Sequence, residues 1–180
     1  CIPMGFKTMV PAMIILTLAW TLGDLVSDKL QAGVFVYNLM QGASISTAIL
    51  PVCLFLVGTG LAFATGTSWG TFGILIPIAT SIFPEGSQML VIAIASILAG
   101  AVCGDHISPI SDTTIMASAG AQCNHVNHVS TQLPYAVSVA AISFITYLVA
   151  GFVQSAWISL PVGVVLTLGY LLFMKKRTEA

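Results

Sequence analysis

The sequence predicts an all-α membrane protein with about five membrane-embedded helical segments, two of them discontinuous. Apolar residues make up 57% of the 180-residue chain and charged residues only 6%, against about 25% charged residues in ordinary globular proteins. No Lys or Arg occurs between Lys29 and Lys175. Apolar runs close to the roughly 20 residues that a helix needs to cross a bilayer follow one another along the chain. We therefore expect residues 1–180 to form a single transmembrane domain.

The apolar runs define the expected helices. They cover residues 8–23, 46–64, 74–83, 89–103, 133–153 and 157–174. Residues 30–42 are too short and polar to span a bilayer, and we expect them at its interface. The Gly- and Thr-rich stretch 65–73 separates the second run from the third, so residues 46–83 form either one interrupted span or a hairpin. We favour the hairpin.

Charged residues set the expected orientation and exclude other classes of protein. Lys175, Lys176 and Arg177 directly follow the last run, and basic residues next to a span stay on the cytoplasmic side. We therefore expect a cytoplasmic C-terminus and, two spans earlier, a cytoplasmic loop at residues 122–132. The net charge of −1 gives no basic surface for nucleic acid, so the lipid bilayer is the expected partner.

The first interruption, GTSWGT at residues 66–71, offers oxygen ligands. Unwound backbone at membrane depth occurs only where protein or water surrounds it, and paired interrupted segments indicate a transporter binding site. Carbonyl groups freed there, with the hydroxyls of Thr67, Ser68 and Thr71, are hard ligands that suit Na⁺. The alternative is that small residues let helices pack closely and the hydroxyls bond their own helix.

The second interruption, GDHISPISDTT at residues 104–114, contains two acids. Pro109 cannot continue a helix, and with Gly104 it predicts unwinding from residue 104 to residue 111. Helix capping would explain one of Asp105 and Asp112 but not both, and an acid within the bilayer is costly. With no basic partner in the interval, these acids face water, carry a proton, bind a cation, or pair with protein outside this chain.

The remaining polar residues give weaker signals. His106 could relay protons beside Asp105 or simply face a solvated cavity. His125 and His128 lie in a polar loop with few further ligands, and the four cysteines lack CxxC spacing, so we expect no metal site. No HExxH occurs, and Asp105 and Asp112 lack the glycine- and aspartate-rich context of an intramembrane protease, so we expect a transporter and not an enzyme.

The two interrupting strings resemble signatures of the NhaC-type sodium/proton antiporters, a branch of the ion transporter superfamily. Residues 16–20 (LTLAW) fit as well, and the similarity to the C-terminal half of that family covers about residues 5–175. The resemblance implies a bacterial cytoplasmic-membrane transporter about twice this length, built from two inverted repeats. The implied partners are the N-terminal repeat, absent here, and a second copy of the chain in a homodimer.

The resemblance also implies a mechanism and a site. Na⁺ and H⁺ would be exchanged by alternating access at mid-membrane, with no cofactor beyond the transported ions. Asp112, helped by Asp105, would bind either a proton or Na⁺ but not both. A channel is a less suitable class, and Na⁺- or H⁺-coupled exchange of organic or amino acids, such as malate for lactate, remains the alternative. The implied ion or substrate site comprises Asp105, Ser108, Ser111, Asp112 and Thr113 together with Thr67 and Ser68 at the tip of the first string.

Overall fold

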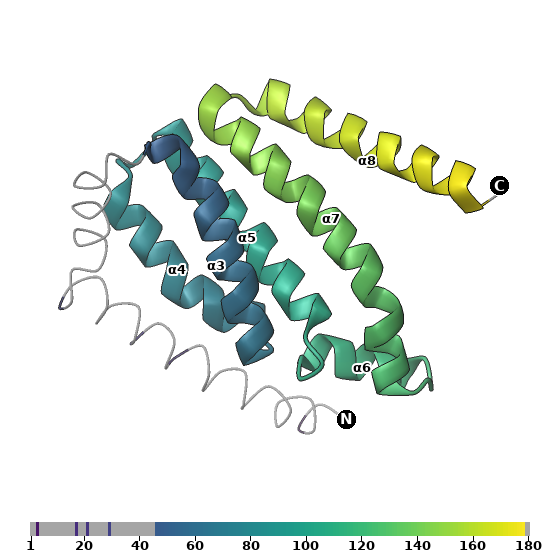
Figure 1. The fold of residues 1–180 in the computed structure, drawn as a ribbon. Helices are drawn as coiled ribbons and strands as arrows, with labels where there is room; N and C mark the ends of the chain where they lie inside the picture. Colours follow the sequence, from purple (N-terminus) through teal and green to yellow (C-terminus); the bar gives the residue numbers. More distant parts are fainter. Residues whose placement is uncertain (1–2, 4–16, 18–20, 22–28, 30–45, 179–180) are drawn as a thin grey trace.

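The computed structural model describes residues 46–178 together with Pro3, Thr17, Thr21 and Lys29. Every element in this part of the chain is a helix, which confirms the all-α prediction (Figure 1). The predicted run 8–23, apart from Thr17 and Thr21, and the interfacial stretch 30–42 lie outside the described residues. The elements are η2 (Thr47–Ile49), α3 (Leu50–Thr65), α4 (Ser68–Ile82), α5 (Gln88–Ile107), α6 (Asp112–Gly120), α7 (His125–Val153) and α8 (Ala156–Thr178).

Local sequence signals explain where these helices begin and end. Pro51 lies in the first turn of α3, where its missing N–H is not needed. The side chains of Ser87 and Asn124 cap α5 and α7 by accepting hydrogen bonds from Leu90 N and Asn127 N, as short polar side chains do at helix N-termini. Gly66 ends α3 in the left-handed conformation, with φ +69°, which glycine adopts without strain.

Residues 46–83 form a helical hairpin, as the sequence analysis favoured. Only residues 66–67, called here the first break, separate α3 from α4, and α4 turns back alongside α3 (Figure 1). The break is shorter than the predicted stretch 65–73 because α4 already begins at Ser68. The hydroxyl-rich start of α4 is helical, and Thr71 Oγ1 donates to Thr67 O at 3.1 Å within its first turn.

The packed part of the molecule consists of α3, α4 and α5. Their buried apolar side chains form one core, made of Leu50, Leu54, Leu75, Ala79, Phe83, Met89, Leu90, Ala93 and Ile97. Helices α3 and α5 run in the same direction, because contacting residues advance by four on both. The contacts are Phe55 O with Gly100, Thr59 O with Gly104 and Phe63 O with Ser108.

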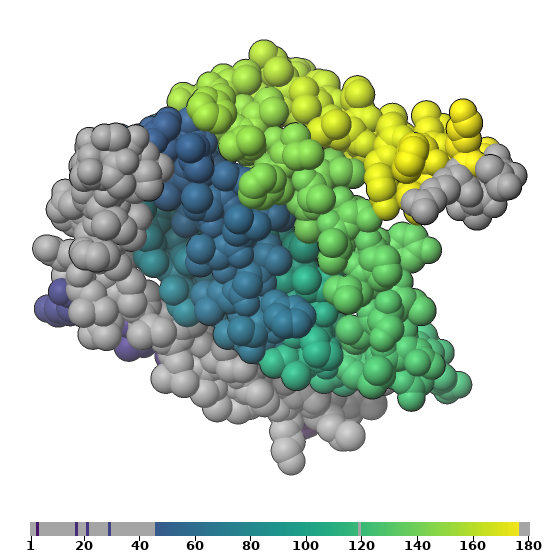
Figure 2. All heavy atoms as spheres, in the orientation of Figure 1, coloured from purple at the N-terminus to yellow at the C-terminus, as the bar shows by residue number. Residues whose placement is uncertain are grey.

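Helices α7 and α8 are apolar but mostly exposed. Four segments are long and apolar enough to cross a membrane, at residues 47–65, 88–107, 125–153 and 156–176. The last two bury little of their surface within the described chain, and Figure 2 shows α8 along one edge of the molecule. Exposed apolar helices are costly in water and suit lipid contact. The described chain is thus a multi-pass membrane protein.

Candidate functional site

The second break is shorter than predicted and begins later. Helix α5 continues through Ile107, so the expected unwinding from Gly104 is wrong. Within the string 104–114, only residues 108–111 are non-helical, and they are called here the second break. Pro109 ends the helix there because its ring disfavours helical geometry at the preceding residue. Gly104 instead allows α5 to pack closely against α3, because a Cβ at this position would overlap the carbonyl oxygen of Thr59 on α3.

Asp105 points into the protein next to this contact. Its side chain is only 3% exposed, and Ser111 Oγ donates a hydrogen bond to its Oδ1 atom at 2.5 Å. Thr113 Oγ1 lies 2.6 Å from Ser111 Oγ. Because the single hydroxyl proton of Ser111 goes to Asp105, Thr113 must donate to Ser111. Thr113, Ser111 and Asp105 therefore form a chain of hydrogen bonds, called here the hydroxyl chain.

Ser111 also organises the N-terminus of α6. Its carbonyl accepts from Ile115 N at 3.0 Å, and its Oγ lies 3.2 Å from Thr113 N and 3.5 Å from Thr114 N. This N-terminus carries partial positive charge. The hydroxyl proton of Ser111 and the α6 N-terminus behind it therefore present partial positive charge to Asp105. No Lys or Arg occurs from residue 46 to residue 174.

The two acids of the second break lie in different environments. Asp112 is exposed at the first position of α6, and its Oδ1 accepts from Thr113 N at 2.8 Å. Asp105, which the sequence analysis treated as the helper, is the buried carboxylate. Ser108 is fully buried, and its Oγ donates to Phe63 O at 2.8 Å. That bond attaches the second break to the last turn of α3.

The two breaks meet, as the resemblance implied. A Cβ on Gly66 would lie 2.8 Å from Ile110 O, so the tip of the α3–α4 hairpin packs directly on the second break. Ser68 is buried and Thr67 is half-buried near this contact. Within the described residues, no hydrogen bond joins either hydroxyl to the hydroxyl chain. Thr67 and Ser68 are thus close to the second break in the fold but belong to a separate group of oxygens.

The histidines near the second break lie in different surroundings. His106 is exposed, and its Nδ1 donates to Val102 O, one turn earlier on α5, at 2.8 Å. Among the described residues, no hydrogen bond joins its ring to the Asp105 carboxylate. His125, expected as a surface residue, instead contacts two elements. Its Nε2 lies 2.7 Å from Pro109 O and its Nδ1 lies 3.0 Å from Ser118 Oγ. Sequence spacing gave no signal for these contacts, which join residues 16 and seven positions apart.

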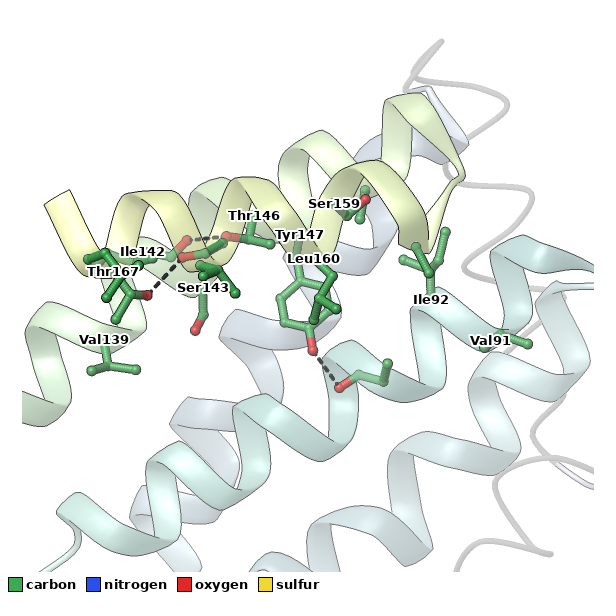
Figure 3. Close-up of a pocket in the computed structure, with 16 residues that line it drawn as sticks. Val91, Ile92, Val139, Ile142, Ser143, Thr146, Tyr147, Ser159, Leu160 and Thr167 are labelled. Carbon is green, nitrogen blue, oxygen red and sulfur yellow. Dashed lines mark hydrogen bonds between the residues drawn. The ribbon is translucent and has the colours of Figure 1, made fainter. Parts of the chain in front are cut away.

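A cavity of about 560 Å³ lies elsewhere, between α5, α7 and α8 (Figure 3). Its lining is mostly apolar, and no acidic or basic side chain contributes to it. Tyr147 donates to Ala95 O at 3.0 Å across this region. The cavity therefore lacks the charged group that an ion site needs, and the meeting of the two breaks is the better candidate site.

Comparison with known proteins identifies the family of the chain. Residues 1–152 match the model of the Na⁺/H⁺ antiporter family. The chain belongs to this family. It is 45% identical over 174 residues to an uncharacterised protein of Haemophilus influenzae, covering 96% of this chain and 33% of that protein.

Two further relatives of this chain have names that indicate transport. The malate-2H⁺/Na⁺-lactate antiporter of Bacillus subtilis is 31% identical over 82% of this chain and 31% of its own length. An uncharacterised Na⁺/H⁺ antiporter of H. influenzae is 29% identical, over 81% and 30%. The chain thus spans about a third of the length of these curated relatives. No solved structure matches the chain.

Proposed function

We propose that this chain is part of an antiporter that exchanges Na⁺ for H⁺ across the cytoplasmic membrane by alternating access. The observation that carries the proposal is a buried carboxylate, Asp105, at the point where two helix breaks meet. An ionised carboxylate buried without a basic partner is costly. A bound cation or proton removes that cost. Family membership supports the transport class.

Competition at Asp105 couples the two ions. A proton neutralises the carboxylate by bonding to one of its oxygens, whereas Na⁺ neutralises it by ligation. The hydroxyl chain serves both states, because a hydroxyl oxygen can donate its proton to the carboxylate and offer a lone pair to a cation. Since one site holds either ion but not both, loading Na⁺ on one side expels a proton there, and alternating access completes the exchange.

Asp112 takes a different role in this proposal from the one expected from sequence. Its exposed carboxylate begins α6 on the outer side of the same break. We place it at the entrance, where its negative charge raises the local concentration of cations. The oxygens of Thr67 and Ser68 on the adjacent hairpin tip would complete the path from that entrance to Asp105.

A second candidate is exchange coupled to organic acids. The name of the B. subtilis relative favours it, and the N-terminus of α6 could hold a substrate carboxylate through its backbone N–H groups. In the described chain, however, this N-terminus already faces the Asp105 carboxylate through Ser111. A second anion there would meet like charge without any Lys or Arg between residues 46 and 174. We therefore rank cation exchange first.

Proteoliposomes containing the full-length protein separate the two candidates. A preset pH gradient should collapse on addition of Na⁺ alone, and malate or lactate should leave the rate unchanged. Because one proton competes with each Na⁺, apparent Na⁺ affinity should fall about tenfold per pH unit where the site is mostly protonated. Collapse that requires an organic acid, or an Na⁺ affinity independent of pH, would replace this proposal with the second candidate.

A further inference from the structure

His125 connects the second break to α6 and α7. The residue begins α7 and is half-buried. Its Nε2 contacts Pro109 O, in the second break, at 2.7 Å. Its Nδ1 contacts Ser118 Oγ, on α6, at 3.0 Å, and the same oxygen lies 2.9 Å from Ile115 O. These three contacts are called here the His125 clasp.

Counting hydrogens shows that the clasp depends on the charge of the imidazole. Carbonyl oxygens only accept, so Nε2 must donate to Pro109 O and Ser118 must donate to Ile115 O. The third contact, between Nδ1 and Ser118 Oγ, then needs a proton on Nδ1 as well. A neutral ring carries one N–H and satisfies only two of the three contacts at once. The imidazolium form satisfies all three.

We propose that His125 is a positioning residue whose protonation tightens the attachment of the second break to α6 and α7. The second ring proton is lost as the pH rises, so the attachment is stronger in acid and looser in base. The carbonyl held by Nε2 belongs to Pro109, between Ser108, which is attached to α3, and Ser111, which contacts Asp105. A change at His125 therefore reaches the carboxylate through two residues of backbone.

Other titratable groups near the clasp come from each element packed around it. None of them hydrogen-bonds to the His125 ring in the described structure, so a pH effect that requires this ring can be separated from theirs by substitution. The groups are Asp105 and His106 on α5, Asp112 on α6, Cys123 in the linker and His128 on α7.

Amide hydrogen exchange tests the clasp without requiring transport. Amide hydrogen exchange of the full-length protein in detergent is measured at pH values from about 5 to 8. The exchange rates of residues 108–114 are corrected for the pH dependence of exchange in an unstructured chain. Loss of one hydrogen bond should raise the corrected rates roughly 2- to 10-fold in a single-proton step as the pH rises. In His125→Gln, whose amide can still donate to Pro109 O but cannot titrate, the step should be absent.

Two further variants complete the design. Ser118→Ala removes the contact that needs the second ring proton, so the step should disappear there too. His128→Gln is the matched control, because its ring lies one turn along α7 and makes no hydrogen bond among the described residues, and it should keep the wild-type step. A step that persists in His125→Gln, that vanishes in His128→Gln, or that is missing from wild type would overturn the proposal.

The consequence for exchange rests on the proposed function. The pH profile of Na⁺-driven proton flux should differ between wild type and His125→Gln and match wild type in His128→Gln. If wild type shows no Na⁺/H⁺ exchange but keeps the amide-exchange step, the proposed function fails and the clasp stands. If flux is normal but its pH profile is the same in all three proteins, the clasp does not act on transport and that part is refuted.

Discussion

Replacing Ser111 with alanine removes the hydroxyl that connects Asp105 to α6 among the described residues. Ser111 is fully buried and donates to Asp105 Oδ1 at 2.5 Å. A hydrogen bond to a charged group contributes about 1.5–3 kcal/mol. Its loss disfavours the ionised carboxylate that Na⁺ requires, and at 1.4 kcal/mol per factor of ten this is about a 10- to 100-fold weaker apparent Na⁺ affinity. Loss of the α6 cap costs about a further 0.5–2 kcal/mol of stability.

Ser96→Ala is the matched control for this substitution. Ser96 is equally buried on α5, but its hydroxyl donates to Ala93 O in its own helix at 2.7 Å. The assay is Na⁺-dependent proton flux in proteoliposomes over a range of Na⁺ concentrations, with thermal unfolding measured on the same preparations. We take about threefold as the smallest difference in affinity that the assay resolves. An apparent Na⁺ affinity of Ser111→Ala that differs from that of Ser96→Ala by less than this would refute the role given to the hydroxyl chain.

Three other predictions follow from the same geometry. Asp112→Asn should weaken apparent Na⁺ affinity without abolishing exchange, because its carboxylate is exposed; complete loss in flux assays would make it the central acid. Gly104→Ala should destabilise the protein by about 1–3 kcal/mol or more, because its Cβ meets the carbonyl of Thr59, whereas Gly60→Ala, which meets nothing within 4 Å, should unfold at the wild-type temperature or above. A cysteine at Asn127 should react only with reagents that reach the cytoplasm; labelling by an impermeant reagent in intact cells would contradict the predicted topology.

Helix type and the positions of the breaks could be predicted because they depend on local chemistry. Pro109 and Gly66 interrupt helices through their own backbone preferences, and apolar length indicates a span. The boundaries were less accurate. Gly104 suggested unwinding, but its role is to allow close contact with Thr59, a distant residue that the sequence alone does not place next to it.

The assignment of the acids could not be made from sequence for the same reason. Asp105 lies between Gly104 and His106 and Asp112 lies between Ser111 and Thr113, and which of the two acids is buried depends on how α5 packs against α3. The glycines at positions 100 and 104, both in contact with α3, mark the buried face of α5 once its partner is known, and Asp105 follows directly. His125 was missed because its partners Pro109 and Ser118 belong to other segments.

The most direct test of the central claim is Na⁺-driven proton flux by full-length protein carrying Asp105→Asn. Asparagine has nearly the same shape as aspartate but carries no charge and cannot exchange a proton for Na⁺. Membrane insertion and thermal unfolding of the variant provide the control for folding. We expect a folded protein in which Na⁺ no longer dissipates a pH gradient. Flux at the wild-type rate in a folded Asp105→Asn protein would contradict the assignment of Asp105 as the group that binds both ions.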